Sequence, residues 1–568
     1  GKESPNPPKY ILAMRGTWGF KDVAADIGDI VRDGAAYEQI IDMYNFYQQL
    51  KAEKGKTYRA AKAETDIGLS VAYSAAISAG PLATKAFEDK LRGKGYFIDG
   101  KPDGHKRALV KKISFVDSGE RYAAGDERVQ GLGILSGHEK LIVSGHSLGG
   151  HLAAAFSRLF PDATEHAYLV NGAGFGNQQS ITGSSLTSIP FNIAELFGTL
   201  GGVGEFDKNK ITNFIGDKNF NIVAQNFKAG LVQAGKTIDT FIESGGRDST
   251  FGHGSGQLSD TMLVSSLFFA LDGKLNRLGI DKAISVLNPI YQAMGNDDTD
   301  ALEQAVYALG KILGVPVPEN KGKDRDVLYR GILDILTKLK SSGTAGKYSV
   351  ESLLLDGSKY DAARPVAEQV YDLAKQNSPT GFAYRYALRE LNPFAVIGAD
   401  YSVHQQKGNL SLYSPDMPNG MTEEYIKQRI QMLAWKNAFD LSNISYEERF
   451  GAINLANLSK HPSGALSTDA VVDTVIDETA SSSILSLLPA NIEDDWIYED
   501  TALGLKLDID GRNPTDLSRH YIRFGGNAEG NLSGGDLEDR LFGDDRDNTL
   551  AGNQGNRSEE HTSELQSR

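Results

Sequence analysis

The chain has 568 residues, too many for one ordinary hydrophobic core, so we expect several domains. Its composition is typical of a globular protein, and its formal net charge of -15 argues against nucleic acid as a partner and against electrostatic docking on anionic membranes, though not against apolar docking. The absence of cysteine excludes disulfides and thiolate chemistry, and no apolar run approaches the roughly 18 residues of a membrane span.

The N-terminal segment GKESPNPPKY contains neither an initiator methionine nor the apolar stretch of a signal peptide. A buried strand is predicted directly after it, at Tyr10–Met14, so we expect the natural N-terminus to lie upstream. From there to about residue 270, apolar strands alternate with helical stretches. This alternation predicts an α/β domain.

Four further strands are predicted in residues 1–270, and they lie at 140–144, 166–172, 210–216 and 236–244. Helical periodicity predicts helices at 37–51 and 149–160, the first of them more typical of a core helix than of a lid. A long insert, roughly residues 30–130, separates the first two strands. Part of it, SVAYSAAISAGPLATKAF, is rich in small and apolar residues.

The stretch LIVSGHSLGGHLAAAF places Ser147 between a predicted strand and a predicted helix. In a chain with 62 glycines, a G-x-S-x-G pattern has a substantial chance of arising by accident, so the flanks decide its meaning. Gly145 and Gly149 leave room for a tight turn that holds the serine in an unfavourable conformation, and a helix N-terminus beneath it favours developing negative charge. This context predicts a nucleophile; the alternative is a glycine-rich turn that serves packing alone.

The same stretch resembles the nucleophile elbow of class 3 (fungal-type) lipases, in which His146 precedes the serine and small residues follow it. Upstream, ILAMRGTWGFKDVAADI resembles the lipase segment in which a strand ends in Arg-Gly-Thr/Ser. The resemblance implies an α/β-hydrolase fold in which Thr17 contributes to an oxyanion hole, with the backbone N–H of Leu148 as second donor. The alternative role of Thr17 is a strand-end cap, and its separation from Ser147 is longer than compact lipases of this type lead us to expect.

In this fold the catalytic residues follow the chain order serine, acid, histidine. We expect the base to be His253, which lies in a glycine- and serine-rich loop after the last predicted strand. The remaining histidines downstream of Ser147 are excluded by their position on the elbow helix, at a strand start, outside the α/β segment or in the C-terminal tail: His151, His166, His404, His461, His520 and His561. The alternative for His253 is a solvated loop histidine.

The acid is expected at the end of the strand 210–216, which places Asp217 there. A carboxylate in that position can accept the histidine Nδ1–H and fix its tautomer. Asp248 is the next candidate, since Asp207 precedes the strand and Asp239 lies within the following one. The alternative for Asp217 is a cap of the following turn.

Three further regions carry little readable chemistry. Residues 185–204 are apolar and end in glycines, which suits either a lid over a lipid site or an ordinary buried helix. Residues 271–391 show helical periodicity, for example at 327–339, and predict packing helices. Residues 392–520 predict short strands, at 409–414 and 503–510, around a helix at 424–439.

Residues 521–556 contain a repeat with a period of nine residues, in which the glycines and leucines keep register: Gly525, Gly534, Gly543 and Gly552, with Leu532, Leu541 and Leu550. The repeat resembles the nonapeptide of RTX (haemolysin-type) proteins, which winds a parallel β-roll and binds Ca²⁺. The copies are degenerate, because the aspartate position reads Gly530, Asp539 and Asn548. We expect structural calcium near Asp539, with Asp536 and Asp545 beside it; the alternative is an acidic linker.

The RTX resemblance implies secretion by the bacterial type I machinery, without a signal peptide, and calcium-driven folding outside the cell. The exporter signal of that family lies at the extreme C-terminus, where this chain instead ends in RSEEHTSELQSR. Residues 557–568 resemble a translated sequencing adapter and are left out of the fold prediction; the alternative is a polar tail.

Together these features predict a secreted serine carboxylic-ester hydrolase that acts on lipids, of triacylglycerol lipase or phospholipase A type, with no cofactor in catalysis. Two alternatives remain open. One is a non-lipid acyl hydrolase, such as a peptidase or a polyester depolymerase. The other is a calcium-dependent surface or adhesion protein with an inactive hydrolase domain.

Overall fold

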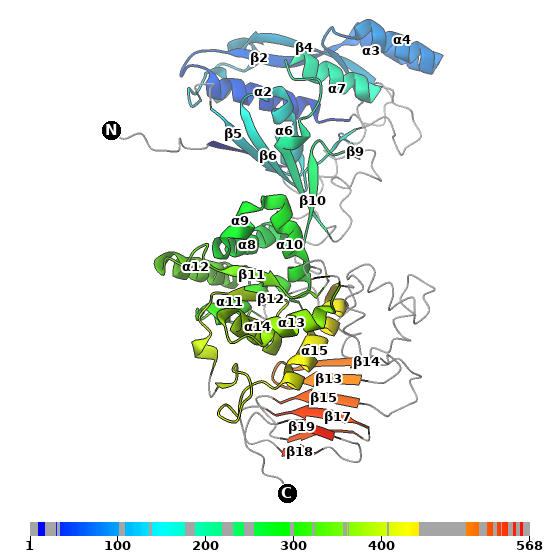
Figure 1. The fold of residues 1–568 in the computed structure, drawn as a ribbon. Helices are drawn as coiled ribbons and strands as arrows, with labels where there is room; N and C mark the ends of the chain where they lie inside the picture. Colours follow the sequence, from blue (N-terminus) through cyan, green and yellow to red (C-terminus); the bar gives the residue numbers. More distant parts are fainter. Residues whose placement is uncertain are drawn as a thin grey trace, which may run out of the picture. The chain divides into compact units, whose positions relative to one another are not determined.

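The computed structural model describes residues 10–16, 30, 34–100, 108–135, 139–176, 188–217, 231–243, 255–295, 300–320, 324–355, 361, 363–405, 408–441, 496–509, 520–525, 531–535, 537–543, 549–551 and 557–560. The chain divides into two compact units (Figure 1). Unit 1 comprises residues 1–242 and 246–259, and unit 2 comprises 243–245 and 260–568. The two units divide within helix α8 (Ser255–Leu271), between Ser259 and Asp260, about ten residues before the boundary expected near residue 270.

Unit 1 is built on a five-stranded sheet in which every neighbouring pair is parallel. Its order is β1-β5-β6-β8-β10, with β1 at Tyr10–Met14, β5 at Leu141–His146, β6 at Thr164–Val170, β8 at Ile211–Gly216 and β10 at Lys236–Thr240. Because all strands run the same way, the residues that follow them meet at one edge of the sheet. The predicted mixed α/β architecture with a central parallel sheet is confirmed.

Two helices predicted from periodicity cover this sheet. They are α2 (Tyr37–Lys51) and α6 (Leu148–Leu159), and they pack against each other over the parallel strands. Tyr47 of α2 meets Phe156 of α6 edge to face at 4.9 Å, and both side chains are buried. Burying Phe156 alone contributes about 2 kcal/mol to folding. The expectation that 37–51 is a core helix is confirmed by its buried face.

The insert between β1 and β5 forms a second layer of structure. Its three strands make an antiparallel sheet in the order β2-β4-β3, with β2 at Arg59–Asp66, β4 at Ala108–Asp117 and β3 at Tyr96–Gly100. Figure 1 shows α2 lying against this sheet, on the side that faces the parallel strands. A helical hairpin, α3 (Ile67–Ala79) and α4 (Pro81–Leu91), connects β2 to β3.

The apolar segment 185–204 contains α7 (Ser188–Thr199), which packs against β3. The Asn192 side chain exchanges hydrogen bonds of 2.8 Å with the N–H and carbonyl of Ile98. The Glu195 carboxylate accepts hydrogen bonds from two further backbone N–H groups, of Gly93 and Gly95. Of the two interpretations that the sequence left open, the structure has the buried helix.

Smaller elements complete unit 1. They are α5 (Ser118–Arg121), the paired strands β7 (Phe175–Gly176) and β9 (Leu231–Val232), and the 3-10 turns η1 (Glu127–Val129) and η2 (Lys208–Lys210).

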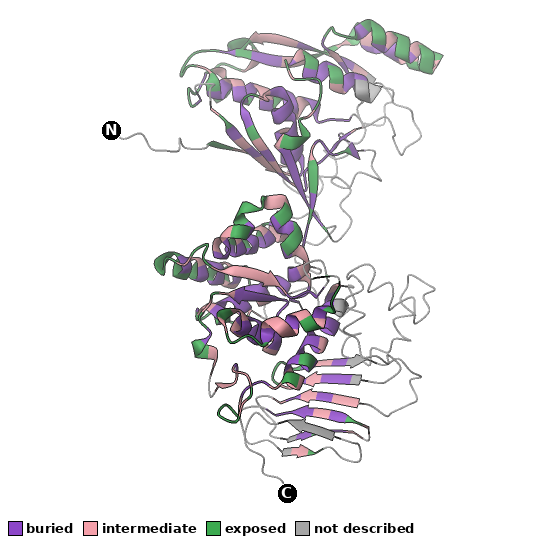
Figure 2. Ribbon diagram, in the orientation of Figure 1, coloured by how far each residue is buried: buried purple, intermediate pink, exposed green. Residues whose placement is uncertain are grey.

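Unit 2 begins with packed helices, as residues 271–391 predicted. Besides the end of α8 they are α9 (Gly273–Arg277), α10 (Ile280–Gln292), α11 (Ala301–Leu313), α12 (Arg325–Ser341), α13 (Val366–Ala374), α14 (Pro379–Arg389), α15 (Glu423–Leu441) and the 3-10 turn η3 (Ser402–His404). Two short antiparallel strands, β11 (Ser349–Ser352) and β12 (Phe394–Ile397), join them. Figure 2 shows buried residues throughout this bundle.

The strand predicted at 409–414 is wrong. The segment makes only isolated bridges, at Leu412 and Ser414, because local turns engage its backbone. The N–H of Tyr413 donates to the carbonyl of Met421, and the N–H of Met421 donates to the carbonyl of Ser411. The apolar alternation of this segment therefore reflects burial of Leu410 in a loop, not a sheet.

The C-terminal strands form two sheets, and from residue 520 onward their parallel partners are eighteen residues apart. In the first sheet Ile522 pairs with Arg540 and Asp539 with Arg557; in the second, Leu532 pairs with Leu550. One coil therefore spans two of the nine-residue repeats. The first sheet has the order β14-β13-β15-β17-β19 and the second contains β16 and β18: β13 Trp496–Asp500, β14 Leu505–Ile509, β15 His520–Phe524, β16 Asn531–Ser533, β17 Asp539–Phe542, β18 Thr549–Ala551 and β19 Arg557–Glu560.

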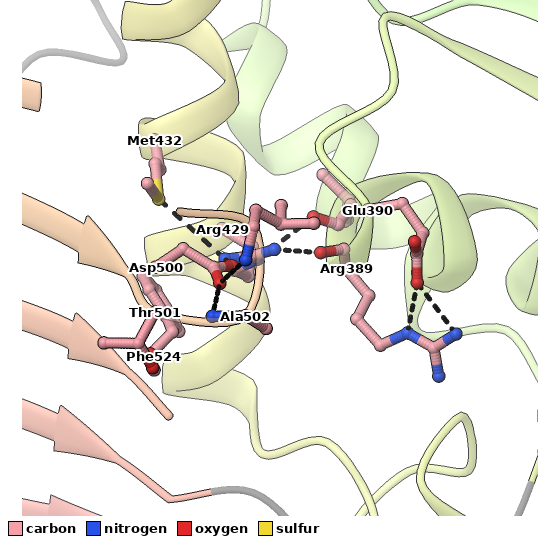
Figure 3. Close-up of polar contacts among 10 residues, drawn as sticks. Arg389, Glu390, Arg429, Met432, Asp500, Thr501, Ala502 and Phe524 are labelled. Carbon is pink, nitrogen blue, oxygen red and sulfur yellow. Dashed lines mark hydrogen bonds and ion pairs between the residues drawn. The ribbon is translucent and has the colours of Figure 1, made fainter. Parts of the chain in front are cut away.

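Helix α15 packs against the first of these sheets through an apolar contact and an ion pair. Tyr425 meets both Phe524 and Phe542 edge to face, and those two rings stack at 5.1 Å. Arg429, 1% exposed, donates to Asp500 at 2.5 Å and to the carbonyls of Leu388 and Arg389 (Figure 3). The helical part of unit 2 and its C-terminal sheet therefore share one buried ion pair.

Candidate active site

Ser147 connects β5 to α6 in a backbone conformation that side chains rarely adopt. Its φ is 56° and its ψ is -120°, outside the regions that non-glycine residues populate. Such a conformation costs on the order of 1–3 kcal/mol and persists where the surroundings impose it. The predicted strand, sharp turn and immediate helix are all present around this serine.

The glycines beside the serine are required by close backbone contacts. A Cβ on Gly145 would lie 2.2 Å from the carbonyl carbon and oxygen of Gly149. A Cβ on Gly149 would lie 2.2 Å from the carbonyl oxygen of Met14, the last residue of β1. Any side chain at either position would push α6 away from the sheet, so the elbow depends on both glycines.

Hydrogen bonds hold the turn in place. The N–H of Ser147 donates to the carbonyl of Val170 at the end of β6, and its carbonyl accepts from His151 and Ala173. Helix α6 begins at Leu148, so the Leu148 N–H is among the first donors of a helix, which have no intrahelical acceptor. Because Ser147 is the residue directly before this helix, the positive end of the helix dipole lies beside the serine.

The segment after β1 approaches the elbow closely. A Cβ on Gly16 would lie 2.5 Å from the carbonyl oxygen of His146 and 3.6 Å from Cβ of Ser147. Thr17, the predicted oxyanion donor, lies outside the described residues, but its neighbour Gly16 packs against the serine.

His151 is buried in α6 and has a structural role. Its Nε2 accepts a hydrogen bond from the N–H of Ala36, so its Nδ1–H donates to the carbonyl of Gly174 at 3.1 Å. The ring stacks on Phe175 at 4.0 Å. Burial lowers the pKa of His151 to about 4, so the imidazole is neutral at pH 7. Its exclusion as the base agrees with this placement.

Asp217 directly follows β8, at the edge of the sheet where Ser147 follows β5. Its N–H donates to the carbonyl of Thr240, and its Oδ1 accepts from the N–H of Ile242 at 3.0 Å. These bonds fix the carboxylate beside the end of β10. His253 lies further along the chain, outside the described residues.

The competing acids are placed differently. Asp207 caps the 3-10 turn before β8, at the opposite edge of the sheet, where it accepts from the N–H of Asn209. Asp239 is exposed within β10. Asp248 and the predicted base His253 lie outside the described residues, which resume at Ser255 with the start of α8. Of the three candidate acids that the structure describes, only Asp217 lies at the edge of the sheet where Ser147 also lies.

Asparagine and glutamine side chains form a hydrogen-bond network near the elbow that was not predicted from the sequence. Asn171 has a φ of 45° at the end of β6, and its Oδ1 accepts from the N–H of Gly216. The Asn213 side chain bonds both the N–H and carbonyl of Gly172 and also reaches Gln233. The network ties together the ends of β6 and β8. Asn-Gly directly after a buried strand was the signal that could have revealed it.

The predicted calcium ligands are described only in part. Asp539 is fully buried in β17, where Oδ1 accepts from the N–H of Tyr521 and Oδ2 from that of Gly535. Each carboxylate oxygen retains acceptor capacity for one further ligand. Asp536 and Asp545 lie outside the described residues, and within the described ones no cluster of three acidic or histidine side chains could hold a metal ion.

A cavity of about 310 Å³ begins beside the end of β1. Its walls come from β1, α2 and α6, and they combine apolar Met14, Met43, Phe46 and Leu152 with polar Arg15, Gln39 and Asp42.

Comparison with known proteins adds no relative, since no protein-family model, no curated protein and no solved structure matches this chain.

Proposed function

We propose that this protein is a serine carboxylic-ester hydrolase with an α/β-hydrolase-type catalytic unit. The observation that carries the proposal is the strained conformation of Ser147 at φ 56°, between a parallel strand and a helix N-terminus. Packing alone does not require a serine there, since glycine adopts this conformation without strain. Ser147 is 4% exposed at the edge of the sheet, and a strained turn of this kind is the arrangement that directs a nucleophilic hydroxyl toward a ligand.

The order of the parallel strands supports the mechanism that we propose, because it brings the ends of β5 and β8 to one edge of the sheet. The Oγ of Ser147 attacks the ester carbonyl carbon while His253 takes its proton, and Asp217 holds the imidazole in the required tautomer. The N–H of Leu148, together with Thr17, stabilises the oxyanion of the tetrahedral intermediate. His253 then protonates the leaving alcohol, and water hydrolyses the acyl-enzyme by the reverse sequence of proton transfers.

A lipid is the substrate class that we favour. The cavity beside Met14 offers an acyl chain contacts with Met43 and Phe46, and it ends at Arg15, the residue before Gly16. A series of p-nitrophenyl esters of increasing chain length tests this, because a lipase prefers long chains. Preference for short esters or amides supports a non-lipid acyl hydrolase instead, and complete inactivity of folded protein supports an adhesion role.

We propose further that the C-terminal repeat is an RTX-type roll that takes up structural calcium, in a protein exported by the type I route. Support comes from the eighteen-residue register of its parallel strands, which matches two nonapeptides per coil. Asp539 and turn residues outside the described ranges would hold the ion and stabilise the roll. Calcium at a hundred times its Kd raises stability by about 2.7 kcal/mol, which thermal unfolding with and without chelator measures.

A further inference from the structure

The hairpin of α3 and α4 is anchored to unit 1 by polar contacts. The hydroxyl of Tyr73 donates to the buried carboxylate of Glu88 at 2.8 Å, joining the two helices. Ser70 Oγ accepts from the N–H of Val110 in β4, and Thr84 Oγ1 donates to the carbonyl of Gly80 at the turn. The polar side chains that make these hydrogen bonds therefore lie on the side of the hairpin that faces the rest of unit 1.

The opposite side of the hairpin is apolar and exposed. Ile67 is 76% exposed, Val71 is 64% exposed, and Leu82 beside the turn is 86% exposed. Ala75 and Ala79 continue the row of α3 at intervals of four residues, which places them on one helix face. Figure 2 shows both helices exposed over most of their length. This distribution is the reverse of a surface helix in water, which turns its apolar stripe inward.

The serine hydroxyls of α3 are satisfied within the helix. This helix contains no charged residue in its thirteen positions. The hydroxyl of Ser74 donates to the carbonyl of Ser70, and that of Ser78 donates to the carbonyl of Ser74. Hydroxyls that bond to their own helix can enter an apolar phase at little cost, because no donor is left unpaired.

Charge distinguishes the hairpin from the rest of the chain. The hairpin, residues 67–91, carries two basic and two acidic residues and is therefore neutral in a protein whose net charge is -15. Lys85 and Lys90 are exposed on α4, whereas Glu88 is buried and Asp89 pairs with Arg92 at 3.2 Å. The two exposed lysines therefore stand beside the apolar face, where a long lysine side chain reaches a charged headgroup while its stem stays in contact with apolar surface.

We propose that the α3–α4 hairpin docks unit 1 on an anionic lipid surface. Helix α3 lies in the plane of the interface with Ile67, Val71 and Leu82 among the acyl chains, and Lys85 and Lys90 meet the phosphate headgroups. None of the helices in the described ranges has the length and apolarity to cross a bilayer. Docking would place the proposed ester hydrolase at its lipid substrate, so its role in lipid hydrolysis rests on the proposed function. The binding experiment itself does not depend on catalysis.

The test uses the full chain with Ser147→Ala, so that lipid is bound and not consumed. Co-sedimentation is measured with vesicles of phosphatidylcholine, with and without phosphatidylglycerol. We expect Val71→Asn/Leu82→Asn to weaken binding to both vesicles by about tenfold or more, since two apolar side chains no longer enter the acyl phase. The matched control, Leu278→Asn/Leu333→Asn, changes two exposed apolar residues of unit 2 and should bind as the parent does.

Lys85→Gln/Lys90→Gln tests the electrostatic part. It should weaken binding to phosphatidylglycerol vesicles by about fivefold per lysine and leave binding to phosphatidylcholine unchanged. The proposal is overturned if the parent sediments with neither vesicle, or if the Val71/Leu82 variant binds like its control. Sedimentation velocity without lipid tests whether a second copy of the chain binds the apolar face instead. If the parent is a dimer and the Val71/Leu82 variant is a monomer, the face is a dimer interface and the docking proposal fails.

Hydrolysis of a soluble short-chain ester by the variants, made with Ser147 intact, separates the two proposals. We expect Val71→Asn/Leu82→Asn to keep the parent rate on this substrate, since both residues are solvent-exposed on the hairpin. If the parent hydrolyses no ester yet binds vesicles, the proposed function fails and the docking stands. If it hydrolyses esters and binds no vesicle, the docking fails alone.

Discussion

Oδ1 of Asp217 accepts a hydrogen bond of 3.0 Å from the backbone N–H of Ile242. This bond joins the residue after β8 to the residues after β10, and the chain runs from there to His253. It thereby fixes one end of the proposed acid–base pair. Asp217 is consequently placed by the backbone of a neighbouring strand, which is the kind of support that an orienting carboxylate requires.

Replacing the acid should abolish most activity without unfolding the protein. Asp217→Asn removes the charge that stabilises the imidazolium and presents an amide that favours the wrong tautomer, so we expect kcat to fall by about 10³–10⁴. Steady-state kinetics on a p-nitrophenyl ester measure the effect. Asp239→Asn, on the exposed face of β10, is the matched control and should leave kcat unchanged. Equal rates for both variants would remove Asp217 from the mechanism.

The elbow glycine that touches β1 should not tolerate a side chain. Gly149→Ala places a Cβ 2.2 Å from the Met14 carbonyl oxygen, and we expect a loss of about 2–3 kcal/mol in the free energy of unfolding, with at least a hundredfold loss of activity. Gly198→Ala is the control, because its Cβ in α7 would meet no atom within 4 Å. That change should stabilise by up to about 1 kcal/mol. A stable, active Gly149→Ala variant would contradict the packing described for the elbow.

The buried His151 should make unit 1 sensitive to acid. Burial lowers its pKa to about 4 from the ordinary value of 6.5, so between these pH values the unfolded chain binds a proton that the folded one does not. The contribution to stability is complete above pH 6.5 and is lost as the pH falls toward 4, by about 3 kcal/mol in total. Urea unfolding across this range measures the slope.

His151→Gln provides the comparison for the pH effect. The amide keeps an acceptor for the Ala36 N–H but does not titrate, so the free energy of unfolding of this variant should depend less on pH over the same range. Identical slopes for the parent and the variant would show that other groups cause the acid sensitivity.

The buried pair between α15 and the C-terminal sheet should be essential to unit 2. Arg429→Met leaves Asp500 buried without its partner, which costs about 3–5 kcal/mol. Arg364→Met, which breaks an exposed pair with Asp372, should cost less than about 1 kcal/mol. Chemical unfolding of both variants measures the difference. A mild effect of Arg429→Met would mean that the helices and the sheet do not depend on this contact.

Local patterns predicted the elements that surround the site. The strand at Tyr10–Met14 and the helix at Tyr37–Lys51 have the predicted bounds, and the elbow glycines and Asp217 occupy the predicted places. The helix was predictable because helical periodicity is a property of neighbouring residues. The prediction that Tyr10–Met14 is a buried strand is wrong in its burial, because β1 lies at the edge of the sheet and Tyr10 and Ile11 are exposed. The turn at Ser147 was recognisable because it needs small residues at fixed spacing.

Features that depend on distant residues were not predictable in this way. The antiparallel sheet of the insert pairs Arg59 with Asp117, and no local signal specifies such a partner. The alternation at 409–414 suggested a strand, but turn hydrogen bonds to Met421 prevail there. Residues Arg557–Glu560, left out of the fold prediction, form β19 in register with β17. The amide network around Asn213 likewise appears only when the strand ends meet.

Covalent labelling tests the central claim, that Ser147 is an activated nucleophile. A fluorophosphonate should modify the folded protein once, and peptide mass spectrometry should place the adduct on Ser147. Ser147→Ala should abolish the label, whereas Ser144→Ala, a change three residues earlier in β5, should retain it. Absence of labelling on the folded parent, or an adduct that persists in Ser147→Ala, would contradict the proposed mechanism.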